Sequence, residues 1–142
     1  MYCSERGFTV KSINIVRFLI SSYERTFFGF SRADTWSVDC WFCGVMPKIL
    51  TYMSIHACSC PYNMTMEEWK QKLRMMASLF RNADPCRYDH ESEMNRPLYK
   101  KWASHQKFDD NTSDSLKYGL FKTWCKNKAF EMFSRYFYDL WI

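Results

Sequence analysis

Hydrophobic residues recur every three to four positions along much of this 142-residue chain, which is the spacing of helices that bury one face. The pattern predicts three main helices, at about residues 35–55, 65–81 and 114–140. A weaker apolar pattern before them favours a helix at about 11–24, and a short strand near 8–15 also fits. We therefore expect an all-α protein, a small helical bundle with the N-terminal segment packed on it.

The most regular segment is residues 65–80, TMEEWKQKLRMMASLF. Thr65 and Glu68 have the spacing of a capping box, in which each side chain accepts a hydrogen bond from the backbone amide of the other residue. The apolar residues of this segment share one helical face, and we expect that face to pack in the core. They are Met66, Trp69, Leu73, Met76, Ala77 and Phe80.

The helix at 35–55 contains a proline. Asp34 or Thr35 is the expected N-cap of this helix. Pro47 lies in its interior, where proline costs about 3 kcal/mol unless the helix adapts. Two structures are compatible with the sequence: the helix kinks near residues 43–44, or it restarts there with Pro47 in its first turn.

The helix at 114–140 is apolar on two sides. One face comprises Tyr118, Cys125, Ala129, Met132, Tyr136 and Leu140, and the other comprises Leu116, Leu120, Trp124, Phe130, Phe137 and Trp141. A helix of this kind is either central to its bundle or shared with a partner subunit. The second face therefore leaves open a homo-oligomer formed through the C-terminal helix.

The length predicts a single domain, residues 1–142, with a polar, loop-rich insert at about 82–113 and one short helix near 97–105. Hydrophobic residues make up 47% of the chain, which argues against intrinsic disorder. Residues 1–7 are polar, and no stretch approaches the roughly 18 uninterrupted apolar residues of a membrane span. We expect a cytoplasmic protein without membrane contact, whose seven cysteines are free thiols.

The cysteines raise one chemical alternative, a zinc site. The spacing Cys40-x-x-Cys43 is typical of zinc ligands, and His56-x-Cys58-x-Cys60 follows after twelve intervening residues. The second cluster is tighter than the usual ligand spacing. The helix at 35–55 would also turn Cys40 and Cys43 inward, where free cysteine packs as a small hydrophobic residue. We expect no cofactor, with zinc at these five residues as the alternative.

No catalytic motif is present in the sequence. It lacks a Walker loop, a dinucleotide-binding glycine motif, a zinc-protease helix motif and a nucleophile elbow. A Cys–His hydrolase needs a thiolate beside a base, and the pair His56 and Cys58 in one loop is not a typical arrangement. No spacing connects His90 or His105 to a cysteine. We therefore do not expect an enzyme.

The net charge is +5, and the basic residues are interleaved with acidic ones. Six residues are the candidates for contacting a partner: Lys70, Arg74, Arg81, Lys100, Lys101 and Trp102. The alternative is a nucleic-acid-binding module within residues 70–107, whose aromatic residues stack on bases while its basic residues contact phosphates. The residues for that role are Tyr88, Tyr99, Trp102 and Phe108 with Arg87, Arg96, Lys100, Lys101 and Lys107.

Three motifs resemble a family of small, uncharacterised bacteriophage and prophage proteins. They are DTWSVD at 34–39, NMTMEEWKQKLRMMASLF at 63–80 and MFSRYFYDLW at 132–141. The family has a D-x-W-S-L-D helix start, a T-x-E-E-W helix start and a Y-F-x-x-L-W-like ending in the same order. The resemblance covers about half of the chain and implies a phage origin and a helical fold, but no activity. This chain departs from the family in its basic charge and in its cysteines at 40, 43, 58 and 60.

The leading hypothesis is a phage-encoded accessory protein that binds a host or phage macromolecule stoichiometrically, with a protein as the expected partner. Inhibition of a host enzyme or a defence factor would be one such action. The reasons are the small size, the lack of a catalytic motif, and an aromatic content of 19%, since aromatic residues dominate protein interfaces. The alternatives are the nucleic-acid-binding module and a small zinc or Cys-dependent protein.

Overall fold

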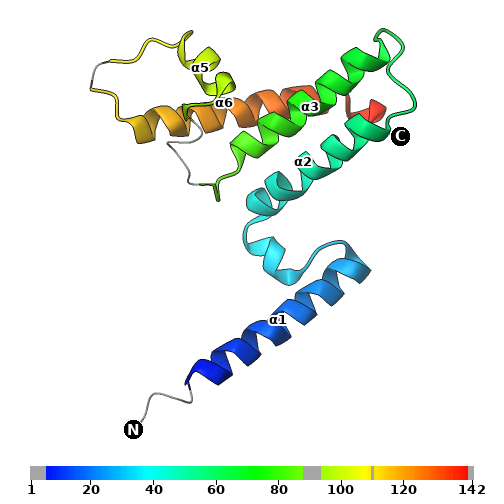
Figure 1. Ribbon diagram of the computed structural model, residues 1–142, viewed down its shortest axis with the longest axis vertical. Helices are drawn as coiled ribbons and strands as arrows, with labels where there is room; N and C mark the ends of the chain where they lie inside the picture. The colour runs from blue at the N-terminus through cyan, green and yellow to red at the C-terminus, as the bar shows by residue number, and fades with distance from the viewer. Residues whose placement is uncertain (1–5, 88–93, 110, 141–142) are drawn as a thin grey trace. The chain divides into compact units, whose positions relative to one another are not determined.

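The computed structural model describes residues 6–87, 94–109 and 111–140, with side chains described from residue 15 onward. All regular elements in these ranges are helical, which confirms the all-α prediction (Figure 1). They are α1 (Arg6–Phe28), the 3₁₀ helix η1 (Arg32–Trp36), α2 (Val38–His56), α3 (Met66–Ala83), α5 (Pro97–Ala103), α6 (Asp114–Arg135) and the 3₁₀ helix η2 (Phe137–Asp139).

The chain divides into two compact units, an N-terminal unit, Met1–Val38, and a C-terminal unit, Asp39–Ile142. The N-terminal unit contains α1 and η1, and the C-terminal unit contains nearly all of α2 and the later helices. The expectation of a single domain with the N-terminal segment packed on the bundle stays a prediction.

Two ion pairs hold η1 against the end of α1. Gly29 ends α1 with a positive φ of 78°, a conformation that glycine adopts without steric cost. Arg25 then donates two hydrogen bonds to Asp34, with Nε–Oδ2 and Nη2–Oδ1 distances of 3.0 and 2.6 Å. Arg32 donates its Nε and its backbone amide to the carboxylate of Glu24, at 2.8 and 2.9 Å. The turn after α1 is therefore fixed by charged side chains from both of its sides.

The predicted N-cap of α2 at Asp34 or Thr35 is wrong. The carboxylate of Asp34 accepts the backbone amide of Ser31 at 2.8 Å and so caps η1 instead. The hydroxyl of Thr35 donates to the carbonyl of Arg32. The short 3₁₀ helix thus uses both candidate caps, and α2 begins later, at Val38.

Pro47 lies inside α2, which runs without interruption from residue 38 to residue 56. The predicted restart of the helix near residue 44 is therefore wrong. The carbonyl of Pro47 accepts a hydrogen bond from the hydroxyl of Thr51 at 2.6 Å. The proline ring is buried, so its packing offsets part of the cost of a proline in a helix.

Helix α3 confirms the most regular pattern in the sequence. The Glu68 amide donates to the Thr65 hydroxyl at 3.3 Å, and the Thr65 amide donates to the Glu68 carboxylate at 2.8 Å. This capping box starts the helix at Met66, as its spacing predicts. The predicted apolar face lies in the core, except that Met66 is only partly buried. The helix continues to Ala83, two residues beyond its predicted end, and Asn82 bonds back to the carbonyl of Ser78.

Helix α3 packs mainly against α6, and Figure 1 shows the two helices crossing. The contact is built around the ring of Phe80, which has no exposed surface. Its centroid lies 5.3 Å from that of Phe42 on α2 and 5.2 Å from that of Phe130 on α6, both edge to face. One side chain of α3 therefore joins all three long helices of the C-terminal unit.

Helix α6 starts after Ser113, whose hydroxyl accepts the amide of Leu116 at 3.3 Å. It ends at Arg135, and η2 replaces the last turn of the predicted helix. The first predicted apolar face is buried from Tyr118 to Tyr136, whereas most of the described residues of the second face are exposed. Phe121 is fully buried under α5 although neither predicted face included it.

The ion pair at Asp34 leads to a prediction about pH. The guanidinium of Arg25 and the amide of Ser31 hold the pKa of the Asp34 carboxyl well below its ordinary value. Because the pKa is lower in the folded state, the pair stabilises the α1–η1 turn at neutral pH. That stabilisation is lost as the pH falls below the unfolded-state pKa of about 3.9. In Asp34→Asn, we expect hydrogen exchange at η1 to be about tenfold faster at neutral pH, because a hydrogen bond to a charged group contributes about 1.5 kcal/mol.

Asp39→Asn is the matched control, because Asp39 is an exposed carboxylate that lies outside the ion pairs of this turn. After correction for intrinsic exchange rates, η1 in the wild type should lose more protection on acidification than η1 in Asp34→Asn, in which only the Glu24 carboxylate that binds Arg32 still titrates across this turn. Protection in the wild type that does not change with pH would contradict the assigned role of Asp34.

Candidate functional site

Helix α1 carries an exposed apolar stripe, which we call the α1 arc. It comprises Ile15, Val16, Leu19, Ile20, Tyr23 and Phe27, each between 48% and 66% exposed. At about 100° per residue these six positions fall within roughly 140° of the helix circumference. The rings of Tyr23 and Phe27 lie one turn apart, with centroids separated by 4.4 Å. Contiguous apolar surfaces of this kind mark sites of interaction in water-soluble proteins.

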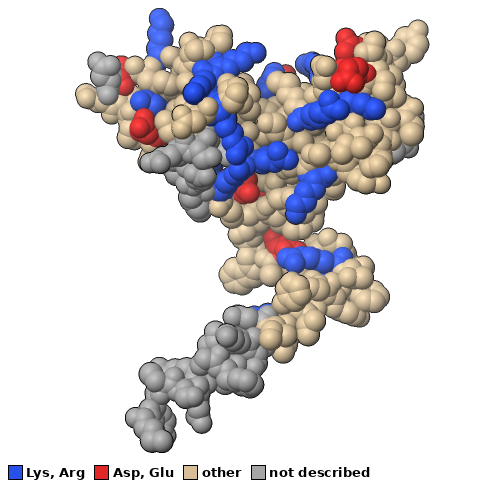
Figure 2. All heavy atoms as spheres, viewed as in Figure 1, with Lys and Arg blue, Asp and Glu red and all other residues tan. Residues whose placement is uncertain are grey.

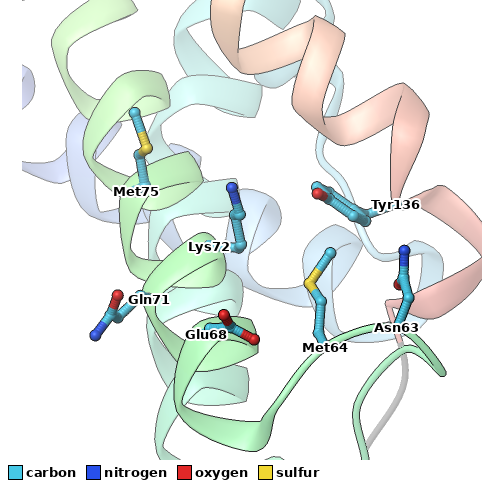
Figure 3. Close-up of a pocket in the computed structure, with 7 residues that line it drawn as sticks. All are labelled: Asn63, Met64, Glu68, Gln71, Lys72, Met75 and Tyr136. Carbon is cyan, nitrogen blue, oxygen red and sulfur yellow. The ribbon is translucent and has the colours of Figure 1, made fainter.

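Two pockets lie beside α3 in the C-terminal unit. The first has a volume of about 360 Å³ and lies between α3 and Tyr136, the residue after α6. Figure 3 shows the Tyr136 hydroxyl directed toward α3, on the side where Lys72 lies. Its lining is mixed in polarity: Asn63, Met64, Glu68, Gln71, Lys72, Met75 and Tyr136.

The second pocket has a volume of about 300 Å³ and is mainly apolar. It is lined by Met75, Leu98, Lys101, Trp102, His105, Gln106 and Trp124. Met75, a flexible side chain that is 43% exposed, contributes to the lining of both pockets. Pockets of this size are at the lower end of small-ligand sites, and each can hold one large side chain of a bound peptide.

The six predicted binding residues are placed on several elements. Lys101 and Trp102 both line the second pocket. The contacts of the described residues bring no other two of the six together. Arg74 pairs with Glu67 at 3.5 Å on the exposed side of α3, where Arg81 is also exposed. Lys70 is half-buried, and Lys100 is exposed on α5.

Two of the aromatic residues predicted to stack on bases have little exposed surface, and the nucleic-acid alternative stays a prediction. Tyr99 and Trp102 are only 6% and 7% exposed, because α5 docks both rings onto Phe121 of α6. Phe108 packs on Trp102, and Tyr88 lies outside the described residues. The basic side chains stay at the surface, and Figure 2 shows Lys and Arg spread over one face of the C-terminal unit.

The structure does not bring the five predicted zinc ligands together. Cys40 forms a disulfide with Cys86, so the expectation of free thiols is wrong for these two residues. Cys43 is a buried free thiol. The thiols of Cys58 and Cys60 donate to nearby backbone carbonyls. The fifth residue, His56, stacks on Tyr52 with ring centroids 4.2 Å apart.

One group of three metal-ligand side chains occurs among the described residues, and it surrounds the disulfide. The sulfurs of Cys40 and Cys86 and a carboxylate oxygen of Asp84 all lie within 4.8 Å of one another. Cys40 is in the first turn of α2, and Asp84 and Cys86 follow the end of α3. Lys122 of α6 donates to the carbonyls of Asp84, at 2.8 Å, and of Arg87. The segment after α3 is thus tied to both α2 and α6.

Cys43 lies one turn along α2 from Cys40 and does not supply a reactive thiolate. Burial, followed by the nearby carboxylates of Asp84 and Asp39, raises the pKa of the Cys43 thiol to about 11. The thiol is therefore protonated at neutral pH, and the protonated form is a poor nucleophile.

No protein-family model, curated protein or solved structure matches this chain. The resemblance to phage proteins therefore stays a prediction. Within the described part of the chain, no helix has the length and hydropathy needed to cross a membrane.

The α1 arc, the disulfide and the two pockets differ in how far they can be predicted from the sequence. The spacing of the α1 arc is visible in the sequence, but its exposure is not, since the same pattern is typical of a packed helix. Cys86 lies 46 residues from Cys40, and no local pattern connects them. The sequence pattern places Trp124 and Tyr136 on opposite faces of one helix. In the structure Trp124 lines the second pocket and Tyr136 lines the first.

The disulfide leads to a prediction about stability. It closes a loop of 46 residues, and for a loop of that length the chain-entropy model gives about 4 kcal/mol of stabilisation. In the presence of a metal chelator, we expect Cys86→Ser to lower the free energy of unfolding by about 2 to 4 kcal/mol in urea titrations. Cys40→Ser should lower it equally, and the double variant should lose no more than either single variant.

Cys58→Ser is the control, since Cys58 is exposed and free. A reductant should bring the wild type to the stability of Cys86→Ser and leave that variant unchanged. If the stability of chelator-treated wild type does not respond to reductant, the disulfide is not present in solution.

Proposed function

We propose that this protein acts by stoichiometric binding to another protein, with the α1 arc as its main contact surface. The observation that supports the proposal is the exposure of six large apolar side chains along one side of α1. Removing such a surface from water is the main favourable term in protein association. Trp36, in the same unit, is 90% exposed and adds to the apolar surface available there.

The chemistry of the arc indicates the kind of partner. An amphipathic helix binds by laying its apolar side into a hydrophobic groove, with large residues one turn apart as anchors. Tyr23 and Phe27 have that spacing, and tyrosine is enriched among the residues that dominate binding energy. Helix α1 has 23 residues and is about 35 Å long, enough to cover a standard interface.

The positive charge of this protein favours a partner with an acidic surface. The chain carries a net charge of +5, and Arg17 is exposed on the side of α1 away from the arc. A groove with an apolar floor and an acidic rim would match both features and would speed association. The motif resemblance supports a phage-encoded accessory protein, and an acidic host enzyme or defence factor would be a partner of this kind.

Phe27 and Phe28 offer a matched test of this proposal. Both are phenylalanines of α1 that are 66% exposed, but their side chains point about 100° apart and only Phe27 belongs to the arc. We expect Phe27→Ala to weaken partner binding about thirtyfold, a hot-spot loss of about 2 kcal/mol, and Phe28→Ala to have little effect. The partner is identified by pull-down of both variants and wild type from bacterial lysate, and affinity and stoichiometry are then measured by calorimetry.

Nuclease treatment of the lysate separates a protein partner from nucleic acid. A protein retained by wild type and Phe28→Ala, lost with Phe27→Ala and insensitive to nuclease supports the proposal. Capture that disappears with nuclease, with an affinity that falls steeply with salt, would favour the nucleic-acid alternative. Equal retention by both variants, or self-association that depends on Phe27 without any other protein, would overturn the proposal.

A further inference from the structure

The three ligand side chains at the disulfide form a set that zinc would accept. Zn²⁺ binds thiolate sulfur at about 2.3 Å and carboxylate oxygen at about 2.0–2.2 Å, so the ligand atoms of one ion lie roughly 3.3–3.8 Å apart. The sulfurs and the carboxylate oxygen here already lie within 4.8 Å of one another. The Cα atoms of Cys40 and Cys86 are 5.9 Å apart, which lets the two sulfurs separate by side-chain rotation once their bond is broken.

Groups around the ligands hold them in place. The amide of Cys86 donates to Oδ1 of Asp84 at 2.9 Å, which leaves the second carboxylate oxygen for a metal. The amide of Cys40 is bound by the carboxylate of Asp39 at 2.9 Å. Lys122 fixes the backbone on both sides of Cys86 through the carbonyls of Asp84 and Arg87. Such outer groups orient the ligands in protein zinc sites.

We propose that, when the disulfide is reduced, Cys40, Asp84 and Cys86 bind one Zn²⁺, with the fourth tetrahedral position open to water. The start of α2 and the segment after α3 are then joined in both redox states, by a sulfur–sulfur bond or by zinc. Two thiolates and a carboxylate around a divalent ion leave one net negative charge, which the ammonium of Lys122 partly offsets. Cys86 is exposed and Cys40 half-buried, so reductant and metal can reach both sulfurs.

The exchange between the two states balances in electrons and protons. Reduction adds two electrons and two protons to the disulfide, and an external dithiol that supplies them becomes a disulfide itself. Zn²⁺ then displaces the two thiol protons and forms two zinc–sulfur bonds. In the reverse direction hydrogen peroxide takes two electrons from the thiolates and two protons from the solvent and becomes two molecules of water, while the disulfide forms again and Zn²⁺ is released.

The test is metal binding by the purified full-length chain with Zn²⁺ alone as the ligand. The reduced wild type, prepared without metal, should bind one equivalent in competition with a chromophoric chelator, and the oxidised wild type should bind none at this site. Reduced Cys40→Ser and Cys86→Ser should lose the binding, and Asp84→Asn should weaken it by at least about tenfold. With Co²⁺ the wild type should show thiolate-to-metal charge-transfer absorption that both serine variants lack.

The control variants are Cys58→Ser and Cys60→Ser, which remove two free thiols of the zinc set predicted from sequence, one exposed and one half-buried. Both should bind zinc as the wild type does. Circular dichroism of each variant with its disulfide absent shows whether the helices persist, so a folding failure is seen directly. Less than about a tenth of an equivalent on the reduced, helical wild type would overturn the proposal, and so would loss of binding in Cys58→Ser.

Discussion

The packing of the C-terminal unit depends on one side chain, Phe80. Its fully buried ring meets Phe42 of α2 and two rings of α6, Phe130 and Phe133, all edge to face. Such contacts favour fixed ring angles and so restrict how the three helices can pack. The capping box at Thr65 starts α3 in the register that carries Phe80 into this position, four helical turns later.

The aromatic residues of the chain fall into a buried group in the C-terminal unit and an exposed group on α1. Tyr99, Trp102 and Phe121 are buried where α5 docks on α6, and of these three Trp102 also lines the second pocket. Tyr23 and Phe27 have no comparable buried neighbours among the described contacts and are exposed in the N-terminal unit. The high aromatic content therefore has two different origins, a ring-rich core and an apolar stripe on α1.

Sequence patterns predicted the features that depend on neighbouring residues. The capping box of α3 and its apolar face are set within a few residues, and both were correct apart from the ends. The role of Asp34 was missed because Arg25, nine residues away, binds it across a turn. The burial of Trp102 was missed because Phe121, on another helix, covers it. The Cys40–Cys86 bond was missed for the same reason, since a separation of 46 residues leaves no local pattern.

Phe80 is the fully buried centre of the C-terminal unit, whereas Phe27 of the α1 arc is 66% exposed. The most direct test compares the free energies of unfolding of Phe80→Ala and Phe27→Ala by urea denaturation. We expect Phe80→Ala to lower the free energy of unfolding by about 3–5 kcal/mol, because a fully buried ring is removed. We expect Phe27→Ala to change the free energy of unfolding by no more than about 0.5 kcal/mol, because Phe27 is exposed. A loss for Phe27→Ala as large as that for Phe80→Ala would contradict this assignment, because truncating an exposed side chain does not cost as much as truncating a fully buried ring.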